Sequence, residues 1–104
     1  MDEVLREAVR APEAAPSVLT FLIADVRGYT QFTVDHGDEA AAKLAMRFAA
    51  AAQKVVSARE GRVVEIRGDE VLSVFSSTRQ ALWASIELNA YFLGESAVDD
   101  VPPI

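Results

Sequence analysis

Two aspartates in this sequence stand where a strand would end and a glycine-containing turn begins. Asp25 closes the apolar run 18–25, and Asp69 belongs to the turn Gly68-Asp69-Glu70 between two short apolar runs. A carboxylate in such a position can bind a divalent cation, and free backbone N–H groups at the start of a following helix can bind a phosphate. The pattern favours a metal ion that carries a phosphate group. Each aspartate is also common in a purely structural role, as a turn or capping residue.

The two acids can act together only if the elements that carry them are neighbours. Residues 18–25 are near-continuously apolar, which predicts a strand covered on both faces. Residues 62–67 and 71–76 predict the strands of a β-hairpin whose turn carries Asp69. If the first strand lies in the same sheet as the hairpin, the carboxylates of Asp25 and Asp69 meet at one edge and can share a divalent ion.

Two helices are predicted around the hairpin. The first runs from about residue 39 to 59, with Asp38 as its N-cap and Gly61 at its end, and one apolar stripe is expected to face the core: Ala41, Leu44, Phe48, Ala51 and Val55. The second runs from Thr78, as N-cap, to about residue 93, and its expected apolar positions are Leu82, Ile86, Ala90 and Leu93, flanked by Trp83 and Phe92. His36, in the turn before the first helix, is expected to be solvated.

The order strand, helix, strand, strand, helix predicts an α+β fold, a ferredoxin-like βαββα core that lacks its final strand. Residues 1–17 are interpreted as an N-terminal arm and linker, with one or two amphipathic turns over 2–10 and a proline-containing stretch over 11–17. Residues 18–104 form the domain, and 98–104 read as a loop. The chain is then either a fragment or a naturally short domain that completes its sheet through a partner.

Composition limits the classes of protein to consider. The 104 residues suffice for one small domain, and 51% of them are hydrophobic, enough for a core. The absence of cysteine excludes disulfides and zinc–thiolate sites and favours a cytoplasmic setting. A net charge of −6 argues against nucleic acid or an anionic membrane as partner. No apolar run is long enough to span a membrane, and the N-terminus lacks the basic start of a signal peptide.

Around Asp25 and Asp69 the sequence resembles the class III nucleotidyl cyclase catalytic domain, the family of adenylyl and guanylyl cyclases. The family's opening strand ends in Phe-x-x-Asp-Ile/Val-x-Gly-Phe/Tyr-Thr, which residues 21–30 (FLIADVRGYT) match with one extra residue between Phe21 and Asp25. Its second signature is Gly-Asp followed by apolar residues and a Phe, matched by Gly68-Asp69 and residues 71–75. Asp69 follows Asp25 by 44 residues, with a long helix between. The resemblance covers about residues 18–92, the first half or so of a full domain.

The resemblance implies conversion of a nucleoside triphosphate, ATP or GTP, to a 3′,5′-cyclic nucleotide and pyrophosphate, for intracellular signalling. Two divalent ions per site, Mg²⁺ or Mn²⁺, would stabilise the charge on the attacking 3′-oxygen and on the leaving phosphates. The implied metal ligands are the carboxylates of Asp25 and Asp69 and the carbonyl of Val26. The backbone amides implied to cradle the triphosphate, at the start of the long helix, are those of Gly28, Tyr29 and Thr30.

Glu65 occupies the position that selects the base in this family, three residues before the Gly of Gly-Asp, where adenylyl cyclases carry Lys and guanylyl cyclases Glu. A carboxylate can accept hydrogen bonds from guanine N1–H and N2–H₂, whereas it offers no donor to adenine N1. Glu65 therefore permits a guanine preference, or is a plain strand residue in a site without selectivity. Arg67, where the family usually has an apolar residue, is a departure that favours the latter.

The family's second base-contacting residue and its transition-state Asn and Arg lie beyond the second helix, and its active sites form between two chains. The resemblance therefore implies a second cyclase-domain chain as partner, in a homo- or heterodimer, and little or no cyclase activity from the isolated chain. Three interpretations remain open. The chain is part of a cyclase domain, a non-catalytic nucleotide-binding or dimerisation module with the cyclase fold, or a structural α/β domain with coincidental acids.

Overall fold

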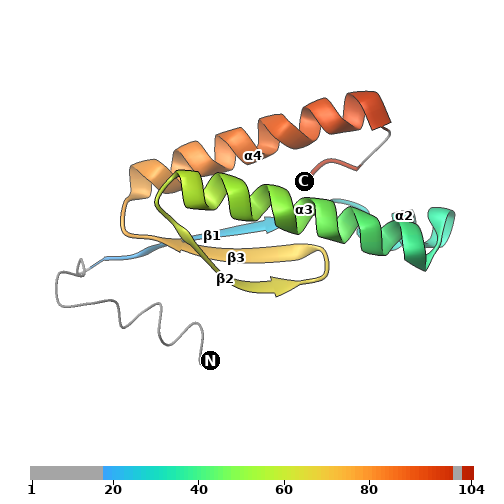
Figure 1. Cartoon of the computed structure of the whole chain (residues 1–104), viewed down its shortest axis with the longest axis horizontal. Coiled ribbons are helices and arrows are strands. Elements are labelled where there is room, and N and C mark those ends of the chain that lie inside the picture. Colours follow the sequence, from blue (N-terminus) through green and yellow to red (C-terminus); the bar gives the residue numbers. More distant parts are fainter. Residues whose placement is uncertain (1–17, 100–101) are drawn as a thin grey trace.

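The computed structural model describes residues 18–99 and 102–104; the predicted arm 1–17 lies outside them. The described chain forms a three-stranded antiparallel sheet with helices packed on one face (Figure 1), in the order β1 (Thr20–Asp25), α2 (Tyr29–His36), α3 (Asp38–Ala58), β2 (Arg62–Arg67), β3 (Glu70–Phe75) and α4 (Thr78–Asp99). This confirms the predicted α+β class and the partial ferredoxin-like βαββα arrangement, with α2 and α3 together in the place of the first helix. No strand follows α4 in the described residues.

The strand order is β1-β3-β2, so the hairpin contributes its second strand to the centre of the sheet. β1 pairs with β3 from Thr20 opposite Phe75 to Asp25 opposite Glu70. β2 and β3 are joined by a two-residue turn whose first residue, Gly68, has φ 55°, the left-handed region that type II′ hairpin turns require there. β1 begins two residues later than predicted and β3 one residue earlier.

β1 is covered on one face only, which corrects the prediction of a strand buried on both. Leu22 and Ala24 pack towards the helices, whereas Phe21 and Ile23 on the other face are 47% and 64% exposed. Successive strand residues point to opposite faces, so the near-continuous apolar run reflects an exposed apolar face and not a second covering layer.

The core lies between the sheet and helices α3 and α4. Phe48 of α3 and Phe92 of α4 meet edge to face, with ring centroids 5.5 Å apart, and both are buried. The predicted α3 stripe is confirmed for Ala41, Leu44 and Phe48. Further along, the fully buried positions are Ala52 and Val56, while Ala51 and Val55, which were predicted, flank the core half-buried.

The end of α3 is a Schellman motif, in which the last carbonyls of the helix accept hydrogen bonds from residues beyond it. The Gly61 N–H donates to the Val56 carbonyl at 2.9 Å, and Glu60 adopts the left-handed conformation with φ 63°. Gly61 was predicted to end the helix. Because Glu60 and not Gly61 adopts the left-handed conformation, a glycine is needed at position 61 for space and not for a positive φ. A Cβ at Gly61 would collide with the ring of Phe75.

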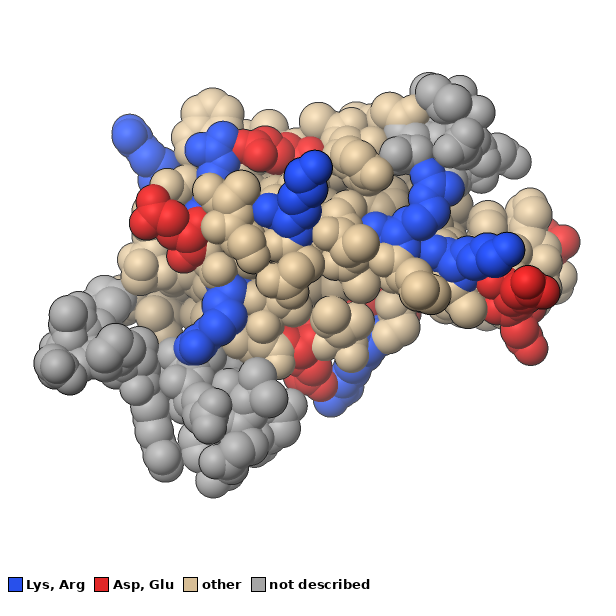
Figure 2. Space-filling model, viewed as in Figure 1, with Lys and Arg blue, Asp and Glu red and all other residues tan. Residues whose placement is uncertain are grey.

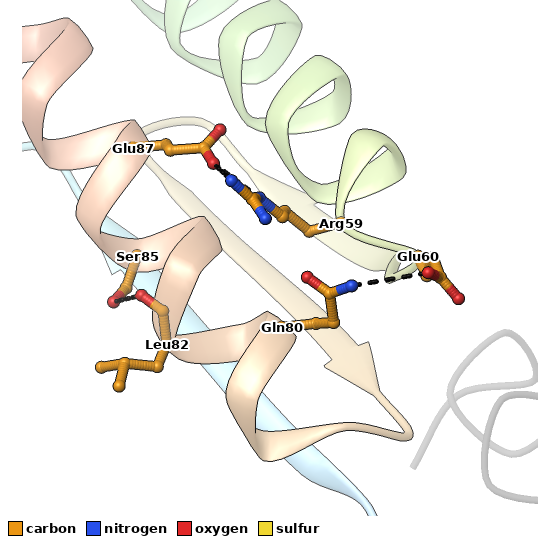
Figure 3. Close-up of polar contacts among 6 residues, drawn as sticks. All are labelled: Arg59, Glu60, Gln80, Leu82, Ser85 and Glu87. Atoms are coloured by element: carbon orange, nitrogen blue, oxygen red, sulfur yellow. Dashed lines mark hydrogen bonds and ion pairs between the residues drawn. The ribbon is translucent and has the colours of Figure 1, made fainter.

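Polar contacts then tie this end of α3 to α4 (Figure 3). Arg59 forms an ion pair with Glu87, and its guanidinium carbon lies 5.5 Å from the centroid of the Trp83 ring. One turn before Trp83 in α4, the Gln80 amide donates to the Glu60 carboxylate at 3.4 Å. These contacts join the end of α3 to the first half of α4.

A short helix, α2, precedes the long one and was not predicted. Its anchor is Tyr29, whose hydroxyl donates to the Ala41 carbonyl of α3 at 2.9 Å, and whose ring packs on the core. The break between the helices is Gly37, with φ 91°, so Asp38 is the first residue of α3 and not its N-cap. His36 is exposed and stacks on Phe32, as expected for a solvated residue.

α4 is longer than predicted. Its N-cap is Ser77, whose hydroxyl accepts the Gln80 N–H at 3.2 Å, while the predicted cap Thr78 is the first helical residue and bonds the Thr20 hydroxyl. The helix passes Gly94 and ends at Asp99, although 98–104 was predicted to be a loop. No helix among the described residues is long and apolar enough to cross a membrane.

The predicted apolar face of α4 is the wrong one. The buried residues are Ala81, Ala84, Leu88 and Phe92, whereas the positions expected in the core are exposed: Leu82, Ile86, Ala90 and Leu93. The side chain of Leu82 projects from the side of α4 away from Glu87 and α3 (Figure 3). Alanines let the helix lie close to the sheet, and the larger aliphatic side chains remain outside.

Candidate metal and phosphate site

Asp25 and Asp69 meet at one end of the sheet, as the sequence predicted. The tip of β1 and the turn between β2 and β3 lie beside each other next to α2 (Figure 1). The Val26 N–H donates to the Asp69 carbonyl at 3.0 Å, which holds the chain after β1 against the turn. Two acids that are 44 residues apart in the chain are thereby positioned by the β1–β3 register and by a two-residue turn.

The electrostatics of this end penalise ionisation of Asp25. Its pKa is raised above the ordinary value, first by desolvation, then by a side-chain hydrogen bond with Asp69 and by the negative charges of Asp69 and Glu70. A hydrogen bond from the Val26 N–H acts in the opposite direction. Like charges within hydrogen-bonding reach of each other favour the neutral form of one partner. The surroundings of Asp25 therefore destabilise its ionised form.

This arrangement fits a divalent cation. A cation bound between the Asp25 and Asp69 carboxylates would offset the repulsion that raises the Asp25 pKa. In the part of the chain that the structure describes, no group of three or more acidic, histidine or cysteine side chains is placed to hold a metal. Two carboxylates alone leave coordination positions for water and phosphate oxygens, which is how Mg²⁺ is usually bound beside a nucleotide. The Val26 carbonyl remains a predicted ligand.

Backbone donors lie beside the acids, at the start of α2. Gly28 is the N-cap, with φ 67°, and no side chain caps the helix. The first intrahelical bond is from the Phe32 N–H to the Gly28 carbonyl, so the amides of Tyr29 and Thr30 precede the first intrahelical donor. The amides predicted to hold a triphosphate are thus at a helix start, but at that of the short α2 and not of the long helix. The Arg27 N–H is taken by the Pro103 carbonyl at 2.8 Å.

Glu65 lies apart from the two aspartates. It sits on β2 opposite Leu72, two rows further from the turn than Glu70 and two strands away from β1. With strands about 4.8 Å apart and residues about 3.4 Å apart along them, its backbone is roughly 12 Å from that of Asp25. The Glu65 carboxylate forms an ion pair with Arg67, which projects from the same face two residues along. A base that bound Glu65 would have to replace this partner.

Glu70 was not among the predicted site residues, although it contributes to the field at the acids. It pairs across the sheet with Asp25 on one side and with Arg67 on the other. The signal was available, because a two-residue turn after Arg67 makes residue 70 the first of the next strand. In a sheet with β3 central, that position adjoins the end of β1.

Charge is distributed unevenly over the surface around the site. Figure 2 shows Lys and Arg side chains spread over the face in view, and Asp and Glu side chains at the end where α2 meets α3 and in separate groups elsewhere on this face. The acids of that junction are Asp35, Asp38 and Glu39. The start of α2 at Gly28 therefore lies next to the paired aspartates and is the end of this helix that can attract an anion, whereas its other end lies next to further acids.

Comparison with models of known protein families gives no match for this chain, and comparison with curated proteins gives none either. The resemblance to nucleotidyl cyclases rests on the motif residues themselves.

Proposed function

We propose that this chain is the metal-binding part of a class III nucleotidyl cyclase domain, acting on a nucleoside triphosphate in the cytoplasm together with a second cyclase-domain chain. The observation that supports the proposal is the meeting of Asp25 and Asp69 beside the uncapped start of α2. The two motifs that carry the resemblance thus converge on one site. A purely structural role for either acid gives no reason for two carboxylates to be held against each other.

In this proposal the aspartates hold the cation and the backbone holds the phosphates. The Asp25 and Asp69 carboxylates bind Mg²⁺ or Mn²⁺, and the amides of Gly28, Tyr29 and Thr30 donate to phosphate oxygens at the positive end of α2. Tyr29 is fixed by its bond to Ala41, so its amide is held in place. When bound, the divalent ions stabilise negative charge on the attacking oxygen and on the leaving phosphates.

The proposal assigns the remaining groups to another chain. The resemblance puts a transition-state Asn and Arg after the second helix, and residues 94–104 contain neither. We therefore expect the isolated chain to bind a metal–nucleotide complex with little or no turnover. A second candidate function, a non-catalytic nucleotide-binding module, is favoured by the ion pair that Arg67 forms with Glu65 at the predicted base-selecting position.

Calorimetric titration of ATP and of GTP, each with and without Mn²⁺, tests the proposal. Binding is expected only with Mn²⁺, and it should be lost in an Asp25→Ala, Asp69→Ala variant and retained in Asp35→Ala, an exposed acid of α2 used as control. Turnover on addition of a complete cyclase domain separates the first candidate from the second. The proposal is rejected if the folded wild-type chain binds neither nucleotide.

A further inference from the structure

A groove lies between the two long helices of the molecule. Its volume is about 510 Å³, and its lining comes from α3 and α4, with no residue of the sheet and none of the candidate metal and phosphate site among the described residues that form it. Small-molecule sites in proteins measure about 300–1,000 Å³. The groove is therefore large enough for a ligand, and binding there does not depend on the proposed function.

The groove lies on the outer side of the helix layer. The buried residues of α3, such as Phe48 and Ala52, face the core, whereas the lining includes exposed neighbours of theirs, such as Ala50 and Ala58. The final strand of a ferredoxin-like arrangement would join an edge of the sheet, in the other layer. The exposure of the groove therefore does not follow from the absence of that strand in the described residues.

The α3 side of the groove offers hydrocarbon surface and few hydrogen-bonding groups. Its small aliphatic residues are Ala50, Ala51, Val55 and Ala58, and the ring of Tyr91 lines the α4 side. These aliphatic residues belong to a helix, whose backbone N–H and C=O groups bond to one another. A polar ligand such as a nucleotide base would lose hydrogen bonds with water here and would not replace them. The groove therefore favours an alkyl chain.

The charged residues at the groove favour an anion. From residue 40 to its end, α3 carries three basic residues, Lys43, Arg47 and Lys54, and no acidic one, in a chain of net charge −6. Arg47 and Lys54 line the groove; Arg47 is engaged in an interaction of its own, whereas Lys54 forms no ion pair with a described residue. The one acid among the described lining residues, Glu87, is paired with Arg59 (Figure 3). The charge of Lys54 is therefore available to an anionic group.

From these observations we propose that the groove binds a single fatty acid, with its alkyl chain against the alanines of α3 and the ring of Tyr91, and with its carboxylate at Lys54. The lining residues of α3 run from 47 to 58, about 16 Å along the helix axis, so an extended alkyl chain can lie between the helices. An anionic membrane is a poorer source of the same chemistry, because its surface would repel a chain of net charge −6. The fatty acid is therefore bound as a free molecule.

Calorimetric titration of the full chain with dodecanoate tests the proposal, with octanoate and decanoate as shorter probes. Each added methylene group should lower the Kd about three- to fourfold, as expected when it is buried. Dodecyltrimethylammonium carries the same alkyl chain on a positive head group and should bind at least about tenfold more weakly. Because a chain of net charge −6 attracts cations overall, such a preference would have to come from the groove. Equal or tighter binding of the cation overturns the proposal.

Two pairs of variants locate the binding. Ala50→Phe fills the groove and should raise the Kd for dodecanoate at least about tenfold. Its control is Ala42→Phe, at an exposed alanine of α3 outside the lining, which should leave the Kd unchanged. Lys54→Gln should raise the Kd about two- to fivefold, the range of an exposed ion pair, and Lys43→Gln should not raise it. Circular dichroism confirms that each variant is folded.

A further variant separates this proposal from the proposed function. A chain with Asp25→Ala and Asp69→Ala should bind dodecanoate like the wild type, because neither residue lines the groove. Equal affinities of Ala50→Phe and Ala42→Phe for dodecanoate would place the binding elsewhere and overturn the proposal. Binding to vesicles of anionic lipid, with none to dodecanoate monomers, would overturn it as well.

Discussion

The two ends of the sheet are organised on opposite principles. At the hairpin end, Asp25, Asp69 and Glu70 are held together although their charges repel, and the adjoining helix begins without a side-chain cap. At the other end, where α3 runs into β2, the chain is closely packed, with a Schellman motif closing the helix and Gly61 against the ring of Phe75. The comparison indicates that stability comes from the packed end, and that the hairpin end is arranged for a ligand at some expense of stability.

Gly61→Ala is expected to have the largest effect on stability. The new methyl group collides with the buried Phe75 ring, and overpacking of this kind costs about 1–3 kcal/mol. Urea unfolding measures the loss. Combining it with Phe75→Leu should cost less than the sum of the two single changes, because the smaller side chain makes room. Strictly additive losses would mean that the Gly61–Phe75 contact is not the cause.

Gly94→Ala is the matched control and should change stability in the other direction. Gly94 lies within α4, and a Cβ there meets no atom within 4 Å. Replacing a helical glycine at an open position stabilises by about 0.5–1 kcal/mol. A rise in the urea midpoint for Gly94→Ala, next to a fall for Gly61→Ala, would locate the constraint in packing and not in glycine content. A fall for both would contradict this.

Asp25→Asn is expected to have the smallest effect on stability, and one that depends on pH. Since the pKa of Asp25 is raised on folding, the folded chain holds this proton more tightly than the unfolded chain, so stability falls as pH rises from the ordinary value to the raised one. Asn removes that penalty. Because the side chain is exposed and water screens it, we expect a gain of about 0.5 kcal/mol at pH 7 and none near pH 3.

Unfolding curves of wild type and Asp25→Asn at several pH values measure this difference. Asp35→Asn serves as the control, because Asp35 is an exposed residue of α2 and does not belong to the pair of acids at the end of the sheet. A variant that is less stable than the wild type at pH 7 would mean that the Asp25 carboxylate contributes to the fold and is not held at its expense.

The meeting of Asp25 and Asp69 was predictable from sequence because it follows from short-range rules. A two-residue turn fixes where Asp69 lies on the hairpin, and a strand that ends in Asp25 beside β3 brings the acids together. The same rules located Ala41, Leu44 and Phe48 in the core, because α3 has one apolar stripe with a clear direction.

The errors arise where tertiary contacts decide. α4 is apolar on most sides, so periodicity favoured the bulky Leu82 and Ile86, whereas close packing on the sheet selects Ala81 and Ala84. α2 is short and has no fully buried residue, and it is held by the bond from the Tyr29 hydroxyl to the next helix and by the rings of Tyr29 and Phe32 against the core. Neither the choice of face nor that bond is encoded in a local pattern.

The central claim, that Asp25 and Asp69 form one cation site, is tested most directly by titrating the chain with Mn²⁺ and following the free-ion signal by electron paramagnetic resonance. We expect saturable binding by the wild type, loss of that binding in both Asp25→Asn and Asp69→Asn, and no change in Asp35→Asn. Equal loss from either single substitution is the signature of a shared site. Binding that survives in both site variants, or its absence from the folded wild-type chain, would contradict the account.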